Sequence, residues 1–324
     1  MSENSLLDKI LKEFNIRYID IKKLNKGYVS RKWLITDMYN KSFILKESCI
    51  KNSERLNYIC YIQEKLNSIS PKIYSSHDKN YVTINNKFYI LYEYINGKQL
   101  ITSQINKNIC FEIGQFMGKL HNLMNTIKEI ELTDKKNTIG LNLCKPNIEK
   151  MNYLINYYKN HDFFYERILL DKLKFVKRID YPKLMSKIEN SLDKQIIHGD
   201  FYIDNIMFKN NSIYILDFDQ AGIFYKLYEL FRGMFFICYD ESKEENENIE
   251  KIKYFIKGYK TENIIKNFDV AYEFYIYMLS NSLTGLDIKS SKKNSCRDFA
   301  IYRYNMLKWI ISIKEVLIEF VNQI

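Results

Sequence analysis

Apolar and polar residues alternate along much of the first hundred positions, and this pattern predicts a lobe built mainly of β-strands. The strands are expected at residues 16–24, 29–38, 42–47, 80–85 and 87–95. Turn residues separate them, among them Asn25-Lys26-Gly27 and Asn85-Asn86. Apolar residues recur at helical spacing in 6–14 and 52–67, so two helices are expected there, the second capped by Asn52 or Ser53.

The spacing of apolar residues changes from that of strands to that of helices after Asn96-Gly97. This pair interrupts the last strand and is expected to mark a hinge between two lobes. Helices are expected at residues 105–120, 148–190, 223–240, 248–259, 263–284 and 297–322. Two or three short strands are expected within 196–220. The pattern therefore predicts an α+β fold, with a small β-rich lobe at 1–96 and a larger α-helical lobe at 97–324.

Composition favours a cytoplasmic protein with a sizeable core. The 324 residues are 46% hydrophobic, which suffices for one large domain or two modest ones. No apolar run approaches the ~20 residues of a membrane span, and the opening residues lack the pattern of a signal peptide. The six cysteines are scattered without a CxxC pair, as in a reduced protein with neither a zinc site nor a disulfide frame.

The formal net charge of +10 does not by itself predict nucleic-acid binding. Lysine, asparagine, isoleucine and tyrosine are abundant throughout the chain, which is typical of compositional drift rather than of a basic patch. The basic residues do not gather with glycine and aromatic residues in an RNA-binding pattern. We therefore expect neither nucleic acid nor membrane as a partner.

Polar residues interrupt an apolar stretch in IIHGDFYIDNIMFKNNSIYILDFDQ, residues 196–220. A tight hairpin would bring Asn205, before its first strand, close to Asp217, after its second, with Asp200 upstream on the same loop. Two carboxylates and an amide oxygen are ligands that Mg²⁺ prefers when it also binds waters and phosphate oxygens. The alternative is a hairpin with capping Asp and Asn side chains, but the ordered spacing favours phosphoryl transfer.

HGDFYIDN followed by ILDFD resembles the aminoglycoside phosphotransferase/choline kinase family, relatives of protein kinases. LNKGYVSRKWLI resembles the family's phosphate-covering hairpin, SFILKES its lysine strand, YILYEYINGKQL its lobe hinge, and IGQFMGKLHNL its helix ending in Leu-His. NSERLNYICYIQEKL, together with the hinge, is similar to the CotS-like spore-coat branch. The resemblance implies a protein-kinase-like bilobal fold, in which 1–96 binds the nucleotide and 97–324 carries the catalytic and acceptor-binding residues.

The resemblance also implies roles for the polar residues of this stretch. Asp200 matches the catalytic aspartate that orients or deprotonates the acceptor hydroxyl, and Asn205 and Asp217 match the metal ligands. His198 is expected to brace the loop by hydrogen bonding. Asp219 is expected to anchor the loop or the metal ligand without binding the metal itself.

Lys46 alternates with apolar residues on its strand, and the resemblance makes it the lysine that grips the α- and β-phosphates. An edge lysine facing water is the alternative. Its expected partner is a glutamate of helix 52–67, where both Glu54 and Glu64 are available, although the preferred register places Asn57 near the expected position.

The remaining nucleotide contacts are expected from the glycine loop and the hinge. Gly27 permits a tight turn, and Ser30 offers a hydroxyl and an amide to phosphate oxygens. The Glu93 carbonyl and the Ile95 amide match the backbone groups that pair with adenine. ATP is the expected donor, with GTP as the alternative and Mg²⁺ as the metal.

Two acidic features lie in the predicted helical lobe. Glu229 falls where relatives often have Asp in a D-L-A motif, and it would brace the helix after the metal loop; a solvated helix acid is the alternative. The acidic run 240–250 would either attract a cationic acceptor or form a solvated connection between helices, and charge runs usually face water.

The sequence thus predicts an ATP- and Mg²⁺-dependent kinase that phosphorylates a hydroxyl of a small molecule. An aminoglycoside, an amino sugar, choline and a homoserine-like acceptor are all compatible with the motifs. The second hypothesis is a kinase-fold structural or spore-coat protein with little turnover, and the complete set of Asp200, Asn205 and Asp217 argues against it. The sequence does not determine the oligomeric state.

Overall fold

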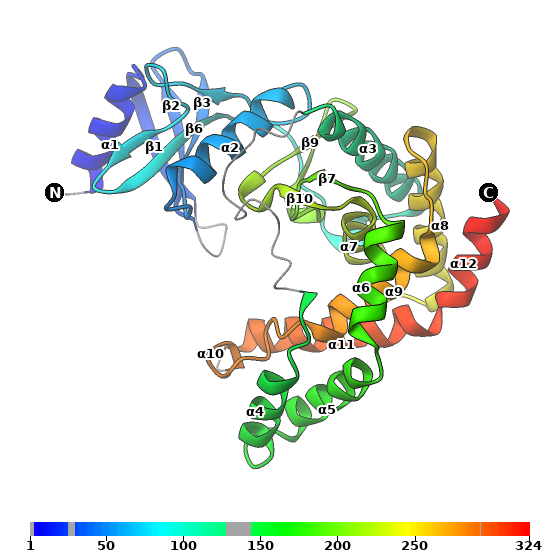
Figure 1. The fold of residues 1–324 in the computed structure, drawn as a ribbon. Coiled ribbons are helices and arrows are strands. Elements are labelled where there is room, and N and C mark those ends of the chain that lie inside the picture. Colours follow the sequence, from blue (N-terminus) through cyan, green and yellow to red (C-terminus); the bar gives the residue numbers. More distant parts are fainter. Residues whose placement is uncertain (1–2, 25–29, 128–143, 292) are drawn as a thin grey trace. The chain divides into compact units, whose positions relative to one another are not determined.

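A computed structural model describes residues 3–24, 30–127, 144–291 and 293–324 of the chain (Figure 1). By their internal contacts, the described residues form two compact units. The first unit holds the described residues of 1–100 together with 204–221, and the second holds the described residues of 101–203 and 222–324, apart from two residues after Asn125 that belong to the first. The lobe boundary at 96/97 stays a prediction.

The first unit is built on a six-stranded sheet in the order β1-β2-β3-β6-β4, with β5 paired to β6. All of these pairs are antiparallel. Its elements are α1 (Glu3–Glu13), β1 (Tyr18–Leu24), β2 (Lys32–Asp37), β3 (Ser42–Glu47), α2 (Ser53–Lys65), β4 (Ile73–Tyr74), β5 (Val82–Ile84) and β6 (Lys87–Glu93). The expected strands are confirmed, and the short β4 is an addition that the pattern did not predict.

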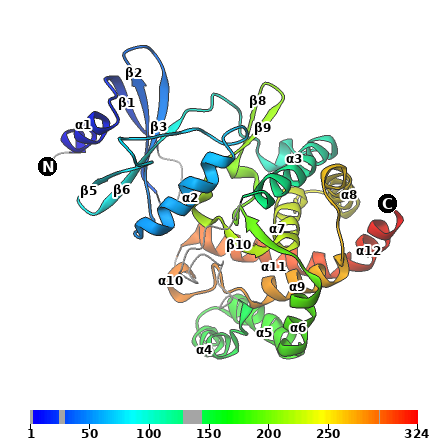
Figure 2. The same cartoon turned by 45° about the horizontal axis from the view of Figure 1, so that its top comes forward.

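Alternation along the strands divides the core of this unit between two helices. Leu45, Tyr89 and Leu91 point to the face covered by α1, whereas Ile90 packs with Leu56 of α2 on the other face. Successive strand side chains point to opposite faces, so each strand supplies both layers. Figure 2 shows the two helices on opposite sides of the strands.

The hairpin β8 (Ile206–Lys209) and β9 (Ser212–Ile215) completes the first unit. Its turn residues Asn210 and Asn211 have φ values of 47° and 61°, as a two-residue Asn-Asn turn requires. Backbone hydrogen bonds of 2.8 and 2.9 Å join Lys98 to Phe208 in both directions. Gly97 permits this approach, because a Cβ at that position would lie 2.6 Å from the Phe208 carbonyl oxygen.

The second unit is mainly helical, with one two-stranded sheet. Its elements are α3 (Lys107–Asn125), α4 (Ile148–Tyr158), α5 (Phe163–Lys177), α6 (Tyr181–Ser191), β7 (Lys194–Ile197), β10 (Gly222–Tyr225), α7 (Lys226–Cys238), α8 (Glu245–Glu262), α9 (Phe268–Asn281), α10 (Ile288–Ser291), α11 (Asn294–Ser312) and α12 (Lys314–Gln323). α9 lies at the centre of this unit, since it is buried on nearly all sides and packs against α5, α6, α7, α11 and α12.

Most helix boundaries in this unit differ from the expected ranges by a few residues, and three ranges differ in kind. The expected helical range 148–190 is three helices, because Asp162 and Asp180 cap two new starts. The range 297–322 divides at Ile313. Residues 222–225 form a strand instead of the first helical turn, because they pair with β7.

Two further expectations concern membranes and cysteines. Within the described ranges, no helix combines the length and the apolar character needed to cross a bilayer. The six cysteines are free thiols, as the absence of paired motifs suggested.

Candidate active site

The first unit contains a cavity of about 240 Å³ between the sheet and the β8–β9 hairpin. Apolar side chains from both sides line it, including Leu24, Ile44, Ile95, Met207 and Leu216. Lys46, Asn205 and Asp217 lie at the same cavity. Residues separated by more than 150 positions in the sequence therefore meet where a flat apolar group and a charged group could bind side by side.

Lys46 is the most enclosed charged group of this cavity, with 3% of its surface exposed. Its Nζ lies 2.9 Å from Asp217 Oδ1 and 2.8 Å from Asp219 Oδ1. Burial alone would lower the pKa of the lysine, but the two carboxylates outweigh burial and raise it above the ordinary value. Lys46 therefore keeps its charge throughout the neutral range.

The prediction that a glutamate of the helix at 52–67 pairs with Lys46 is wrong for both Glu54 and Glu64. Glu54 and Glu64 are exposed, and neither forms an ion pair in the described part of the chain. The side of α2 that packs against the sheet carries Leu56 and Cys60, which turns both glutamates toward solvent. Asp219 takes the place of the glutamate, and α2 contributes Arg55 instead, whose guanidinium donates to the Asp219 carbonyl oxygen at 3.2 Å.

Asn205 and Asp217 lie together as the hairpin predicted. The Leu216 amide donates to the Asn205 carbonyl at 2.8 Å, directly beside the first pair of the ladder. Asp217 adopts a left-handed conformation with φ of 64°, which is costly for a residue other than glycine and is typical of functional sites. Lys32 adds a second cation, 3.4 Å from Asp217 Oδ2.

The donor set around Asp217 fits Mg²⁺ better than a transition metal. No group of three His, Cys, Asp or Glu side chains in the described residues could hold a metal by itself. One carboxylate and one amide oxygen on a shared cavity suit Mg²⁺, which takes few protein ligands and completes its shell with water and phosphate oxygens.

The other expected nucleotide contacts have different positions. Gly27 lies outside the described residues. Ser30 is partly exposed, and its hydroxyl lies beside the Cys49 thiol rather than in the lining of the cavity. Glu93 and Ile95 both line the cavity at the end of β6.

The loop that carries Asp200 belongs to the second unit. Gly199 has φ of 78°, and this left-handed conformation turns the chain between His198 and Asp200. His198 is fully buried, and its Nδ1 accepts from the Asp200 amide at 3.3 Å. The imidazole therefore lies against the backbone of the loop, in agreement with the bracing role expected for it.

Glu229 of α7 fixes the backbone of the same loop by accepting hydrogen bonds from it. It is 1% exposed, which excludes the solvated alternative. Its carboxylate accepts from the amides of His198, at 3.1 Å, and Gly199. The His121 ring lies 3.0 Å away. Burial would raise the pKa of Glu229, but the His121 hydrogen bond and charge, followed by His198 and the Gly199 amide, outweigh burial and lower it.

Arg232, one turn further along α7, is the residue that sequence reasoning missed. Its Nη2 lies 2.7 Å from Asp200 Oδ1, and its Nη1 donates to the Gly199 carbonyl at 3.1 Å. The available signal was the i, i+3 spacing from Glu229, which puts both residues on one face of α7. Helix α7 therefore fixes both the backbone of the loop and the carboxylate of Asp200.

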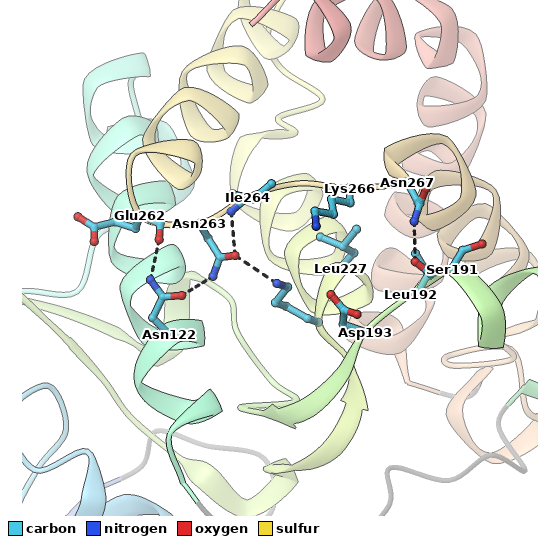
Figure 3. Close-up of a pocket in the computed structure, with 11 residues that line it drawn as sticks. Asn122, Ser191, Leu192, Asp193, Leu227, Glu262, Asn263, Ile264, Lys266 and Asn267 are labelled. Atoms are coloured by element: carbon cyan, nitrogen blue, oxygen red, sulfur yellow. Dashed lines mark hydrogen bonds between the residues drawn. The ribbon is translucent and has the colours of Figure 1, made fainter.

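A polar cavity of about 430 Å³ also lies in the second unit, and Figure 3 shows the residues that line it. The Asn263 amide oxygen accepts from Lys226 at 3.1 Å, and its nitrogen donates to Asn122 at 2.7 Å. Asn267 donates to the Ser191 carbonyl at 2.7 Å. These amides satisfy one another, so the cavity has a structural explanation.

The chain is similar in sequence to known phosphotransferases. The family model described as Phosphotransferase enzyme family matches residues 20–254. The chain is 26% identical over 251 residues to the homoserine kinase of Zymomonas mobilis, covering 75% of this chain and 72% of that protein.

Two solved kinase structures share the fold. The choline kinase of Cryptosporidium parvum has a TM-score of 0.67 at 14% identity, with 99% of both chains covered. A spectinomycin phosphotransferase in complex with ADP and its substrate has a TM-score of 0.66 at 14% identity, covering 97% of this chain and 99% of that one. These matches do not single out the spore-coat branch.

Proposed function

The chain belongs to the phosphotransferase enzyme family, and on that premise we propose that it transfers the γ-phosphoryl group of ATP to a hydroxyl of a small molecule. The acceptor oxygen bonds to phosphorus as the bond from phosphorus to the leaving ADP oxygen breaks. The hydroxyl proton passes to the Asp200 carboxylate. A kinase-fold scaffold without turnover is not favoured by any feature of the site.

The first unit supplies the donor side of the reaction. The apolar walls of its cavity, with the backbone of Glu93 and Ile95, hold the base, and Lys46 binds the α- and β-phosphates. Asn205 and Asp217 would hold Mg²⁺, and the bound metal would supply positive charge to the phosphate oxygens. ATP is the proposed donor, and GTP remains the alternative because backbone contacts discriminate weakly between the bases.

The second unit supplies the acceptor side. Asp200 orients the acceptor hydroxyl and receives its proton, and Glu229 and Arg232 support this role by holding the loop and the carboxylate in a fixed position. His198 keeps the backbone of that loop in place. The observation that carries the proposal is the meeting of Lys46, Asn205 and Asp217 at one cavity.

A pair of variants tests the division of roles. Asp200→Asn is expected to lower kcat by about 10²–10⁴-fold, the size of a lost general base, and to leave the affinity for Mg-ATP within about twofold. Asp217→Asn is expected to weaken Mg-ATP binding at least about tenfold, because Asp217 would supply the carboxylate ligand that holds the metal of Mg-ATP. Coupled-assay kinetics and calorimetric titration with and without Mg²⁺ measure the two effects.

Asp78→Asn, in an exposed turn of the first unit, is the matched control and is expected to change neither quantity. Wild-type turnover in the Asp200 variant would remove this residue from its role. Unchanged Mg-ATP affinity in the Asp217 variant would show that the metal binds elsewhere.

The acceptor belongs to a set that the motifs leave open: an aminoglycoside, an amino sugar, choline or another amino-alcohol, or homoserine. The relative from Zymomonas mobilis is named a homoserine kinase, which brings this amino acid into the set on sequence similarity. A screen of nucleotide consumption across these compounds identifies the acceptor class.

A further inference from the structure

The second unit contains a cavity of about 570 Å³ with basic side chains in its lining, which we name the Arg303 cavity. Among the described residues that line it, Lys150, Arg232 and Arg303 are basic and Asp287 is the single acidic one. The Asp287 carboxylate accepts hydrogen bonds from the hydroxyl and the amide of Ser290. The cavity therefore carries an excess of positive charge.

Arg303 has no anionic partner in the described part of the chain. Its Nε is buried without a hydrogen bond, and its guanidinium lies 5.7 Å from the centre of the Phe299 ring. Burial lowers the pKa of Arg303, and nearby Arg232 lowers it further, against the opposing effect of two tyrosines. Arg303 as a whole is partly buried, and a partly desolvated cation without an anion is costly unless a ligand brings the missing charge.

Tyr275 supplies a second polar group without a partner at the same cavity. Its hydroxyl is buried and forms no hydrogen bond with the described residues. It comes from α9, whereas Arg303 comes from α11, so two elements independently present a donor here. Lys172 lies close to Arg303 and holds the end of α9 by donating to the Leu279 and Ser282 carbonyls, at 2.7 and 3.0 Å.

Arg232 connects this cavity to the catalytic loop. It lines the Arg303 cavity and its Nη2 contacts the Asp200 carboxylate at 2.7 Å. A molecule bound in the cavity could therefore contact Arg232, which in turn contacts the proposed base Asp200. The acidic run 240–250 contributes no side chain to the lining of this cavity.

We propose that the Arg303 cavity binds the acceptor through a carboxylate, so that the substrate is a small hydroxy acid or hydroxyl-bearing amino acid. This inference rests on the proposed phosphotransferase function. The planar guanidinium of Arg303 matches a carboxylate with two parallel donors, and the Tyr275 hydroxyl adds a third. A polycationic aminoglycoside or choline would face three basic side chains and is disfavoured by their charge.

The test compares acceptors that differ only in the carboxylate. L-homoserine and L-homoserinol, which has a hydroxymethyl group in place of the carboxylate, are titrated calorimetrically and assayed for phosphorylation with Mg-ATP, beside choline and kanamycin. L-serine and 4-hydroxybutyrate extend the carboxylate series. The carboxylate compounds are expected to bind at least about tenfold more tightly than homoserinol, as the loss of a charge-assisted pair requires.

Arg303→Met is expected to raise KM for the carboxylate acceptor about 10- to 100-fold and to keep or raise the melting temperature, since it removes a partly buried charge without an ion-pair partner in the described residues. Lys308→Gln is the matched control, because Lys308 is exposed on the same helix and does not line the cavity. If Arg303→Met does not fold, Tyr275→Phe removes only the hydroxyl and is expected to raise KM several-fold.

The outcomes separate the two proposals. The carboxylate site would be overturned if homoserinol, choline or kanamycin were phosphorylated as well as the carboxylate compounds or better. It would also be overturned if the enzyme bound Mg-ATP normally but bound no carboxylate compound. Both outcomes leave the proposed kinase function unaffected. No binding of Mg-ATP would overturn the kinase function itself, and the inference with it.

Discussion

Lys46 shows at the scale of one residue how a buried charge is stabilised in this fold. Two carboxylates from the segment after the hairpin, Asp217 and Asp219, lie within 3 Å of its ammonium group. The neighbouring helix contributes an arginine to the Asp219 backbone and no carboxylate to the lysine in the described contacts. Lys46 and Asp217, the proposed metal ligand, thus form a direct ion pair, so that a substitution at one changes the electrostatic environment of the other.

Asp219→Asn is expected to reduce the free energy of unfolding by about 1–3 kcal/mol, because Lys46 keeps Asp217 but loses one charge-assisted hydrogen bond in a buried site. Urea unfolding followed by circular dichroism measures the change. Glu54→Gln is the control, since the structure leaves Glu54 exposed. A larger loss in the Glu54 variant than in the Asp219 variant would restore the helix glutamate as the partner of Lys46.

Helix α7 is the element on which the acceptor side of the site depends. Glu229 in its first turn holds the loop amides, and Arg232 in the next turn holds the Asp200 side chain. His121 of α3 contacts Glu229 on one side and Tyr259 of α8 on the other, at 3.0 and 2.9 Å. Residues of three helices therefore hold the loop that carries Asp200 through the buried carboxylate of Glu229.

Glu229→Gln is expected to destabilise the protein by about 2–4 kcal/mol at pH 7, since the replaced group is a buried anion with several donors. The pKa of Glu229 is lowered in the fold, so its contribution is complete above the unfolded pKa near 4.5 and is lost as the pH falls through the folded value. Urea titrations at pH 7, 5 and 4 measure this dependence. Equal slopes against pH in wild type and variant would contradict the assignment.

At the scale of the whole molecule, the chain links its two units through the β8–β9 hairpin. β7 and β10 of the second unit flank the hairpin in the sequence and pair with each other. The hairpin itself bonds to the first unit at Lys98 and through Ile215, whose amide donates to the Ile69 carbonyl at 2.8 Å. Unfolding of the second unit therefore releases both ends of a hairpin that lines the Lys46 cavity of the first unit.

We expect the two units to unfold together, and the chain offers one tryptophan in each to follow this. Trp33 lies in the core of the first unit, and Trp309 is buried in the second. Variants Trp33→Phe and Trp309→Phe each leave one fluorescent probe. In each variant, the urea midpoint from tryptophan fluorescence is expected to equal the midpoint from circular dichroism. Both midpoints are expected to rise when Mg-ATP is added. Two separated midpoints would show that the units are independent.

Local chemistry in the sequence determined the strands, most helix positions and the hairpin register. Alternation, turn asparagines and capping residues act over a few positions, so they can be read before the chain is folded. The same reasoning placed Asn205 and Asp217 at the two ends of one hairpin, where the structure has them, with Asp200 on the loop before it. It missed β4 and β10, because strands of two to four residues exist only through the partners they pair with.

Only the tertiary structure decided which charges meet. The partner of Lys46 depends on which side of α2 faces the sheet, and the role of Arg232 depends on how α7 lies under the loop. Arg303 lacks an anionic partner because the described residues that surround it in the cavity do not place a carboxylate next to its guanidinium. Ion pairing and desolvation are set by distance in space between residues far apart in the chain, and a linear pattern does not contain that distance.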